Sequence, residues 1–185
     1  MLKKIASKIV VRQLRRYVQR LISAHDLTVI MITGTVGKTS TKMAIGKTLE
    51  LNGRKVCYSQ DSYNTEVGVP LALFGMKAPE RVSSPTAWRA VFRQMSEMIA
   101  DYPYDLAILE IAEDERAMML PWVRLMKPTI GVLTGVSPAH MERFSSLETL
   151  RDDAITLVSE AKTVFYDADF DVVREVMERR KGAVS

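Results

Sequence analysis

The chain of 185 residues is 47% hydrophobic, which is enough for one domain with a buried core. It carries a formal net charge of +4 and one cysteine, Cys57, so an internal disulfide framework is excluded and a reducing, cytoplasmic compartment is favoured. It has no run of about 18 apolar residues, which excludes a membrane-spanning helix.

The basic charge is concentrated at the N-terminus. Residues 1–20 carry no acid and seven basic side chains, Lys3, Lys4, Lys8, Arg12, Arg15, Arg16 and Arg20. Subtracting these seven from the 26 Lys and Arg leaves 19 basic against 22 acidic residues, so the rest of the chain has a net charge of −3. A mildly acidic body argues against nucleic-acid binding.

Residues 1–26 are predicted to be a basic amphipathic helix that precedes a domain at 27–185. Apolar side chains recur at helical spacing between the basic ones: Ile5, Ile9, Leu14, Tyr17, Val18, Leu21 and Ile22. The segment could pack on the domain or on a neighbour, or lie peripherally on the anionic inner face of a membrane. It could also be a disordered or partner-binding arm.

Short apolar strands alternate with helices along the rest of the chain. Strands are expected at 27–33, 55–59, 105–112, 129–134 and 163–166, and helices at 38–52, 86–102, 113–126, 145–159 and 169–180. The helix at 113–126 is expected to be interrupted near Pro121. This order predicts an α/β, P-loop NTPase-like fold, a mostly parallel sheet with helices on both faces. Ligands of such sheets bind at the carboxyl ends of the strands, here the loops 33–39, 60–66, 110–115 and 135–140.

The sequence TGTVGKTS, residues 33–40, follows a predicted strand and opens a predicted helix. It resembles the Walker A pattern G-x-x-x-x-G-K-[ST], but the leading glycine is Gly34 where Ile32 occupies the usual position. Backbone N–H groups of the loop would face the phosphates of a nucleotide, together with the helix dipole. Lys38 would reach the β- and γ-phosphates, and the Thr39 hydroxyl would bind Mg²⁺. The alternative is a glycine turn that caps a helix, with Lys38 solvated.

Three more side chains stand at or after the ends of predicted strands. Glu110 could bind Mg²⁺ directly or through water, although acids are common at exposed strand ends. His140 could be a ligand or a structural histidine. Asn64 could be a turn residue, or it could hydrogen-bond a phosphate or substrate from the same edge of the sheet.

Taken together, these motifs resemble the central ATP-binding domain of the Mur ligase family. The resemblance runs in register from about Thr28 to Asp169, through TGTVGKTSTK, YNTEVGVPLALF, LAILEIA, KPTIGVLTGVSPAHMERFSSLE and VFYDAD. Among the branches of the family, the sequence most resembles the UDP-N-acetylmuramoyl-tripeptide–D-alanyl-D-alanine ligases. Branches that act on folate, cyanophycin or other muramoyl intermediates stay open.

The resemblance implies a cytoplasmic, ATP-dependent ligase of peptidoglycan synthesis. ATP would phosphorylate a carboxylate of a UDP-muramoyl-peptide, and a D-Ala-D-Ala-like amine would attack the acyl phosphate to form an amide bond. Carried over by position, Lys38, Asn64, Glu110 and His140 would be catalytic, and Thr39, Glu110 and His140 would hold Mg²⁺. The nucleotide phosphates would be bound by Gly34, Thr35, Val36, Gly37, Lys38, Thr39 and Ser40.

The sequence also departs from the family pattern. Many members carry a lysine fourteen residues after the motif histidine, where this chain has Ala154, with Asp153 beside it as a candidate substitute. Family glycines and a Gly-Glu/Asp pair after Glu110 are replaced by Ala112, Ala117 and Met118.

The resemblance covers one of the family's three domains, and we expect this domain to be incomplete at its C-terminus. The chain could therefore be a ligase part that a partner chain completes. The alternative is an ATP-binding family member without ligase activity, acting as a regulatory or partner-dependent subunit.

Overall fold

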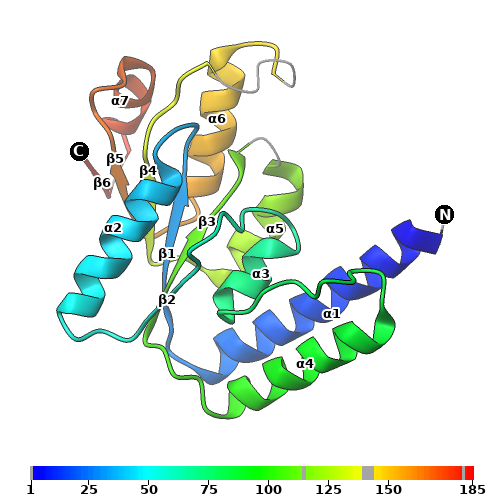
Figure 1. The fold of residues 1–185 in the computed structure, drawn as a ribbon. Helices are drawn as coiled ribbons and strands as arrows, with labels where there is room; N and C mark the ends of the chain where they lie inside the picture. The colour runs from blue at the N-terminus through cyan, green and yellow to red at the C-terminus, as the bar shows by residue number, and fades with distance from the viewer. Residues whose placement is uncertain (1, 114–115, 139–143, 181) are drawn as a thin grey trace.

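The computed structural model describes residues 2–113, 116–138, 144–180 and 182–185. In these residues six strands form one parallel sheet, in the order β2-β3-β1-β4-β5-β6 (Figure 1). The strands are β1 (Thr28–Thr33), β2 (Val56–Tyr58), β3 (Leu106–Glu110), β4 (Ile130–Leu133), β5 (Thr163–Tyr166) and β6 (Ala183–Val184). The predicted α/β fold with a parallel sheet is confirmed.

Alternate side chains of β1 enter two different layers of the core, because successive residues of a strand point to opposite faces. Ile30 and Ile32 belong to a small cluster beneath α2 (Lys38–Leu51). Val29 and Met31 belong to a larger cluster on the other face. The helices that contribute to the larger cluster next to the sheet are α3 (Gly68–Leu73), α5 (Arg116–Met126), α6 (Leu147–Val158) and α7 (Asp171–Met177). Helices therefore cover both faces, as predicted.

An outer layer is formed by α1 (Leu2–Ala24) and α4 (Pro85–Ala100), which lie side by side (Figure 1). Leu14, Val18 and Leu21 of α1 are fully buried, and the ring of Tyr17 stacks on Phe92 of α4 with centroids 5.4 Å apart. This apolar face of α1 is packed on the domain, in agreement with the first of the three interpretations of the segment. Membrane-surface contact stays a prediction.

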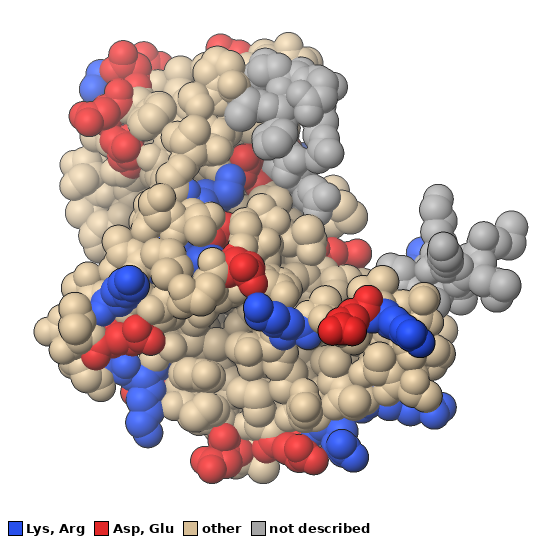
Figure 2. All heavy atoms as spheres, viewed as in Figure 1, with Lys and Arg blue, Asp and Glu red and all other residues tan. Residues whose placement is uncertain are grey.

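The structure offers no helix in its described part that is both long and apolar enough to cross a bilayer. Acidic and basic side chains are interspersed over the face drawn in Figure 2. The body of the chain therefore presents a mixed charged surface on this side.

Helix α5 differs from the sequence prediction, because it continues through Pro121 without interruption. Proline lacks the N–H that would bond to the carbonyl of Ala117, and this loss falls in the second turn of a short helix whose Trp122, Val123 and Met126 are buried. Burial of this apolar face outweighs the missing hydrogen bond. The two-residue strand β6 was not predicted.

Candidate functional site

Gly34 lies where the loop between β1 and α2 passes closest to the segment after β4. Its φ of +127° lies in the region that only glycine adopts readily. A Cβ at this position would stand 2.5 Å from Thr134 Oγ1 and 2.8 Å from the carbonyl oxygen of Gly135. Glycine at position 34 is therefore a packing requirement of this loop.

Hydrogen bonds fix the loop to the segment after β4. The backbone N–H of Thr35 donates to the carbonyl of Gly135 at 2.8 Å, and Thr35 Oγ1 accepts from the N–H of Ser137 at 2.8 Å. Thr134 Oγ1 donates to the carbonyl of Val36 at 2.6 Å. Gly37 then begins α2 without a side-chain cap. The first N–H groups of α2 are thus left for a ligand, with the positive end of the helix dipole behind them.

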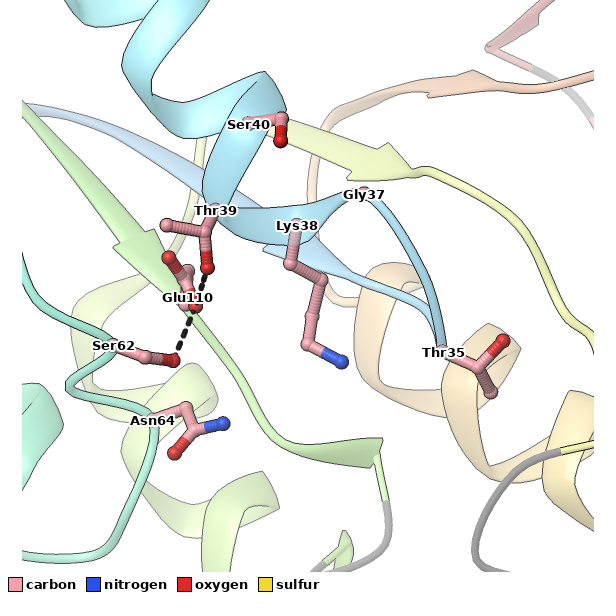
Figure 3. A pocket seen from close by; sticks show the side chains of 8 residues that line it. All are labelled: Thr35, Gly37, Lys38, Thr39, Ser40, Ser62, Asn64 and Glu110. Atoms are coloured by element: carbon pink, nitrogen blue, oxygen red, sulfur yellow. Dashed lines mark hydrogen bonds between the residues drawn. The ribbon is translucent and has the colours of Figure 1, made fainter.

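An open cavity of about 400 Å³ lies in front of this helix end (Figure 3). Eight residues line it: Thr35, Gly37, Lys38, Thr39, Ser40, Ser62, Asn64 and Glu110. Its lining is mostly polar, and it brings together side chains from the β1–α2 loop, the segment after β2 and the end of β3. Asn64 and Glu110, which the sequence places at the same edge of the sheet as the glycine loop, line this cavity together with it.

Glu110 is 2% exposed and is contacted by side chains from α2 and from the segment after β2. Its Oε2 accepts hydrogen bonds from Ser62 Oγ at 2.8 Å and from Thr39 Oγ1 at 3.2 Å (Figure 3). Lys42 Nζ lies 2.7 Å from Oε1 as an ion pair without hydrogen-bond geometry, and it also donates to the carbonyl of Asp61 at 2.8 Å. Glu110 is therefore a buried, paired carboxylate rather than an exposed acid at a strand end.

Lys38 forms an ion pair with Glu113, which the sequence predicts at the start of a helix. Its Nζ lies 3.0 Å from Glu113 Oε2 and 3.4 Å from Oε1, and it also donates to the carbonyl of Gly34. Glu113 is 1% exposed, whereas the side chain of Lys38 keeps 15% of its surface accessible. The alternative of a solvated Lys38 is wrong.

Three site residues were missed from the sequence: Lys42, Ser62 and Glu113. Lys42 follows Lys38 by four residues, a spacing that places both side chains on one face of a helix and could have indicated it. Glu113 stands in the loop 110–115 that the sequence predicts at the site, but the sequence also predicts it as the first residue of the helix 113–126. Ser62 could not have been singled out, because nothing in the sequence distinguishes it from the other polar residues of the loop 60–66.

Two predicted positions lie apart from this cavity or outside the described chain. His140 falls within 139–143 and is outside the described residues. Asp153 pairs with Arg116 at 2.8 Å and does not line the cavity. Burial raises the pKa of Asp153, and the Arg116 guanidinium opposes that shift. Ala154 is fully buried in the core. The structure therefore gives Asp153 a structural ion pair.

The described donors fit a magnesium ion that is shared with nucleotide oxygens. The Thr39 hydroxyl and the Glu110 carboxylate are adjacent hard oxygen donors, and Glu110 Oε1 accepts no hydrogen bond within the described residues. Those residues hold no group of three or more His, Cys, Asp or Glu side chains that could bind a metal alone. Mg²⁺ usually binds through one or two protein oxygens, substrate phosphates and water, which this donor set allows.

Comparison with known proteins matches residues 32–185 to the Mur ligase middle domain. The chain is similar to the UDP-N-acetylmuramoyl-tripeptide–D-alanyl-D-alanine ligase of Mycobacterium leprae, at 34% identity over 127 residues, covering 69% of this chain and 20% of that protein. The ligase of the same name from Synechocystis sp. is 32% identical over 115 residues, covering 62% of this chain and 20% of that protein. This chain thus spans about a fifth of the length of these relatives.

Solved structures show the same fold. A MurF ligase from Thermotoga maritima in complex with ADP has a TM-score of 0.71 at 22% identity, covering 94% of this chain and 36% of that chain. A pseudomurein peptide ligase type C from Methanothermus fervidus has a TM-score of 0.59 at 20% identity, covering 85% of this chain and 26% of that chain.

Proposed function

Because this chain belongs to the Mur ligase family through its middle domain, we propose that it supplies the ATP site of an amide-bond-forming ligase in peptidoglycan precursor synthesis. The observation that carries the proposal is the cavity at the N-terminus of α2, where Lys38, Thr39, Asn64 and Glu110 converge. Backbone N–H groups, a lysine and a helix dipole together suit a polyphosphate. The similarity to ligases that act on a muramoyl-tripeptide supports the substrate class.

The proposed reaction has two steps. A carboxylate oxygen of a UDP-muramoyl-peptide attacks the terminal phosphorus of ATP, and the bond to the bridging oxygen breaks to release ADP. The amine of a D-Ala-D-Ala-like dipeptide then attacks the acyl carbon, phosphate leaves, and the amine loses a proton to give the amide. Lys38 would neutralise charge on the transferring phosphoryl group, and Asn64 would hydrogen-bond a phosphate or the acceptor carboxylate.

Thr39 and Glu110 are the described side chains that would hold magnesium, and His140 remains a predicted third ligand. A bound Mg²⁺ would neutralise the phosphate oxygens of the nucleotide. Ser62 and Lys42 would act on Glu110, because their contacts orient its carboxylate at the end of β3.

A second candidate function is nucleotide binding without ligation, in a regulatory or partner-dependent subunit. Three features favour it. Lys38 is paired with Glu113, Ala154 replaces the lysine that many family members carry, and Asp153 is paired with Arg116. None of these features prevents phosphates from reaching the backbone of the loop.

Phosphate release distinguishes the two candidates. The chain is mixed with Mg-ATP, UDP-muramoyl-tripeptide and D-Ala-D-Ala, alone and with candidate partner chains that resemble the other ligase domains. A ligase should release phosphate only when all three substrates are present, and Lys38→Ala should lower the rate by about 100-fold or more. Nucleotide binding without release in every combination would support the second candidate, and no nucleotide binding at all would reject both.

A further inference from the structure

Two buried ion pairs leave the described phosphate site without net side-chain charge. Lys38 Nζ lies 3.0 Å from Glu113 Oε2, and Lys42 Nζ lies 2.7 Å from Glu110 Oε1. Side chains that bind polyphosphates by charge normally offer an excess of positive charge. Among the described residues, each lysine is neutralised by its own carboxylate, so the positive field of this part of the chain comes from the N–H groups and dipole of α2.

The two carboxylates differ in what else holds them. Glu110 accepts hydrogen bonds from Thr39 and Ser62 in addition to its contact with Lys42. Glu113 is 1% exposed, and its described side-chain contacts are both to Lys38 Nζ, at 3.0 and 3.4 Å. Within the described part of the chain, the cation that contacts the Glu113 carboxylate is therefore the lysine that a phosphate would need.

A nucleotide that enters this cavity brings its phosphates to Lys38, which already contacts the Glu113 carboxylate. If its phosphate shares Lys38, two anionic groups contact one ammonium. If it displaces Glu113, a buried carboxylate is left without its cation, which costs free energy. Both outcomes weaken binding of a bare nucleotide. A divalent cation relieves this cost, because it places two positive charges beside the phosphates.

Building on the nucleotide site proposed above, we propose that Glu113 determines the form of nucleotide that this chain accepts. Glu113 disfavours the metal-free nucleotide, so that ATP or ADP binds as its complex with a divalent cation. The residue acts through its charge on Lys38 and does not need to contact the nucleotide.

The test compares ADP affinity in excess Mg²⁺ and in EDTA by calorimetry, because ADP avoids turnover. The measured quantity is the ratio of the dissociation constant in EDTA to that in Mg²⁺. Glu113→Gln keeps the size of the side chain and an oxygen that can accept from Lys38, but it removes the charge. We expect this variant to lower the ratio at least about tenfold, mainly through tighter binding in EDTA. Glu113→Asp keeps the charge and should hold the ratio within about threefold of wild type.

Two further variants complete the experiment. Glu80→Gln makes the same charge change on the exposed loop between α3 and α4 and should leave the ratio unchanged. If Glu113→Gln does not unfold cooperatively, Glu113→Ala is used in its place. We expect the same decrease in the ratio of dissociation constants. An unchanged ratio in the neutral Glu113 variants would overturn this inference while leaving the proposed function intact. If wild type bound no Mg-ADP, the proposed function itself would fail.

Discussion

Buried charges distinguish this site at the scale of single residues. Lys42, Glu110 and Glu113 are each 2% exposed or less, so their charges are tolerated because each has an oppositely charged neighbour. A buried pair contributes little net stability compared with an apolar pair, but breaking it is costly. The pairs therefore fix geometry more than they stabilise the fold, and each side chain is constrained by its partner.

Cys57 provides a prediction on pH at the same scale. Burial raises the pKa of its thiol from 9.0 to about 11, and Sγ donates to the carbonyl of Ala72 at 3.2 Å. Between these two pH values the unfolded chain loses the thiol proton while the folded chain keeps it. The stabilisation is therefore fully present below about pH 9 and is lost as the pH rises towards 11.

Urea unfolding of wild type and Cys57→Ala at a series of pH values measures this effect. Titrating groups that do not interact with Cys57 cancel in the difference between the two proteins. The stability advantage of wild type should fall by on the order of 2 kcal/mol from pH 9 to 11. A difference that stays constant over this range would show that burial does not hold the thiol neutral.

At the scale of elements, Lys42 joins α2 to β3 and to the segment that follows β2. Its ammonium contacts Glu110 on β3 and the carbonyl of Asp61. Lys42→Met keeps most of the apolar stem but leaves Glu110 buried without its cation. We expect a loss of about 3–5 kcal/mol in the free energy of unfolding, measured by urea titration at neutral pH.

Lys47 provides the matched control, because it is an exposed lysine on the same helix. Lys47→Met should change stability by no more than about 0.5 kcal/mol. The double variant Lys42→Met/Glu110→Gln should recover part of the loss, since it removes both charges. Equal small effects of Lys42→Met and Lys47→Met would contradict the structural role of the pair.

Some features of the loops and strands at the site could be predicted from the sequence, and others could not. Gly34 and Gly37 are local signals, because the backbone of the loop itself requires them, and the alternation of strands and helices predicted which loops would meet. Glu110 was found because it ends a strand at the edge where those loops converge. The partners of Lys42 and Glu113 could not be predicted, because they depend on how closely α2, β3 and the following loop approach in three dimensions. The predicted interruption near Pro121 is wrong because burial of the apolar face of α5 outweighs the tendency of proline to break a helix.

At the scale of the whole molecule, the parallel sheet places every strand's carboxyl end at one edge, and this arrangement builds the site from segments far apart in sequence (Figure 1). The outer layer of α1 and α4 packs against the larger core and contributes no residue to the lining of the cavity. The chain spans about a fifth of the length of the relatives it matches. The cavity at the start of α2 is described in this chain, whereas nucleotide binding there and ligation are proposed.

If Lys38 binds the phosphates of a nucleotide, its removal must weaken binding of Mg-ATP, which calorimetric titration measures. Wild type should bind, Lys38→Ala should bind at least about tenfold more weakly because a phosphate loses its cation, and exposed Lys47→Ala should bind within about twofold of wild type. Equal affinity of wild type and Lys38→Ala for Mg-ATP would contradict a phosphate-binding role for the loop at the start of α2.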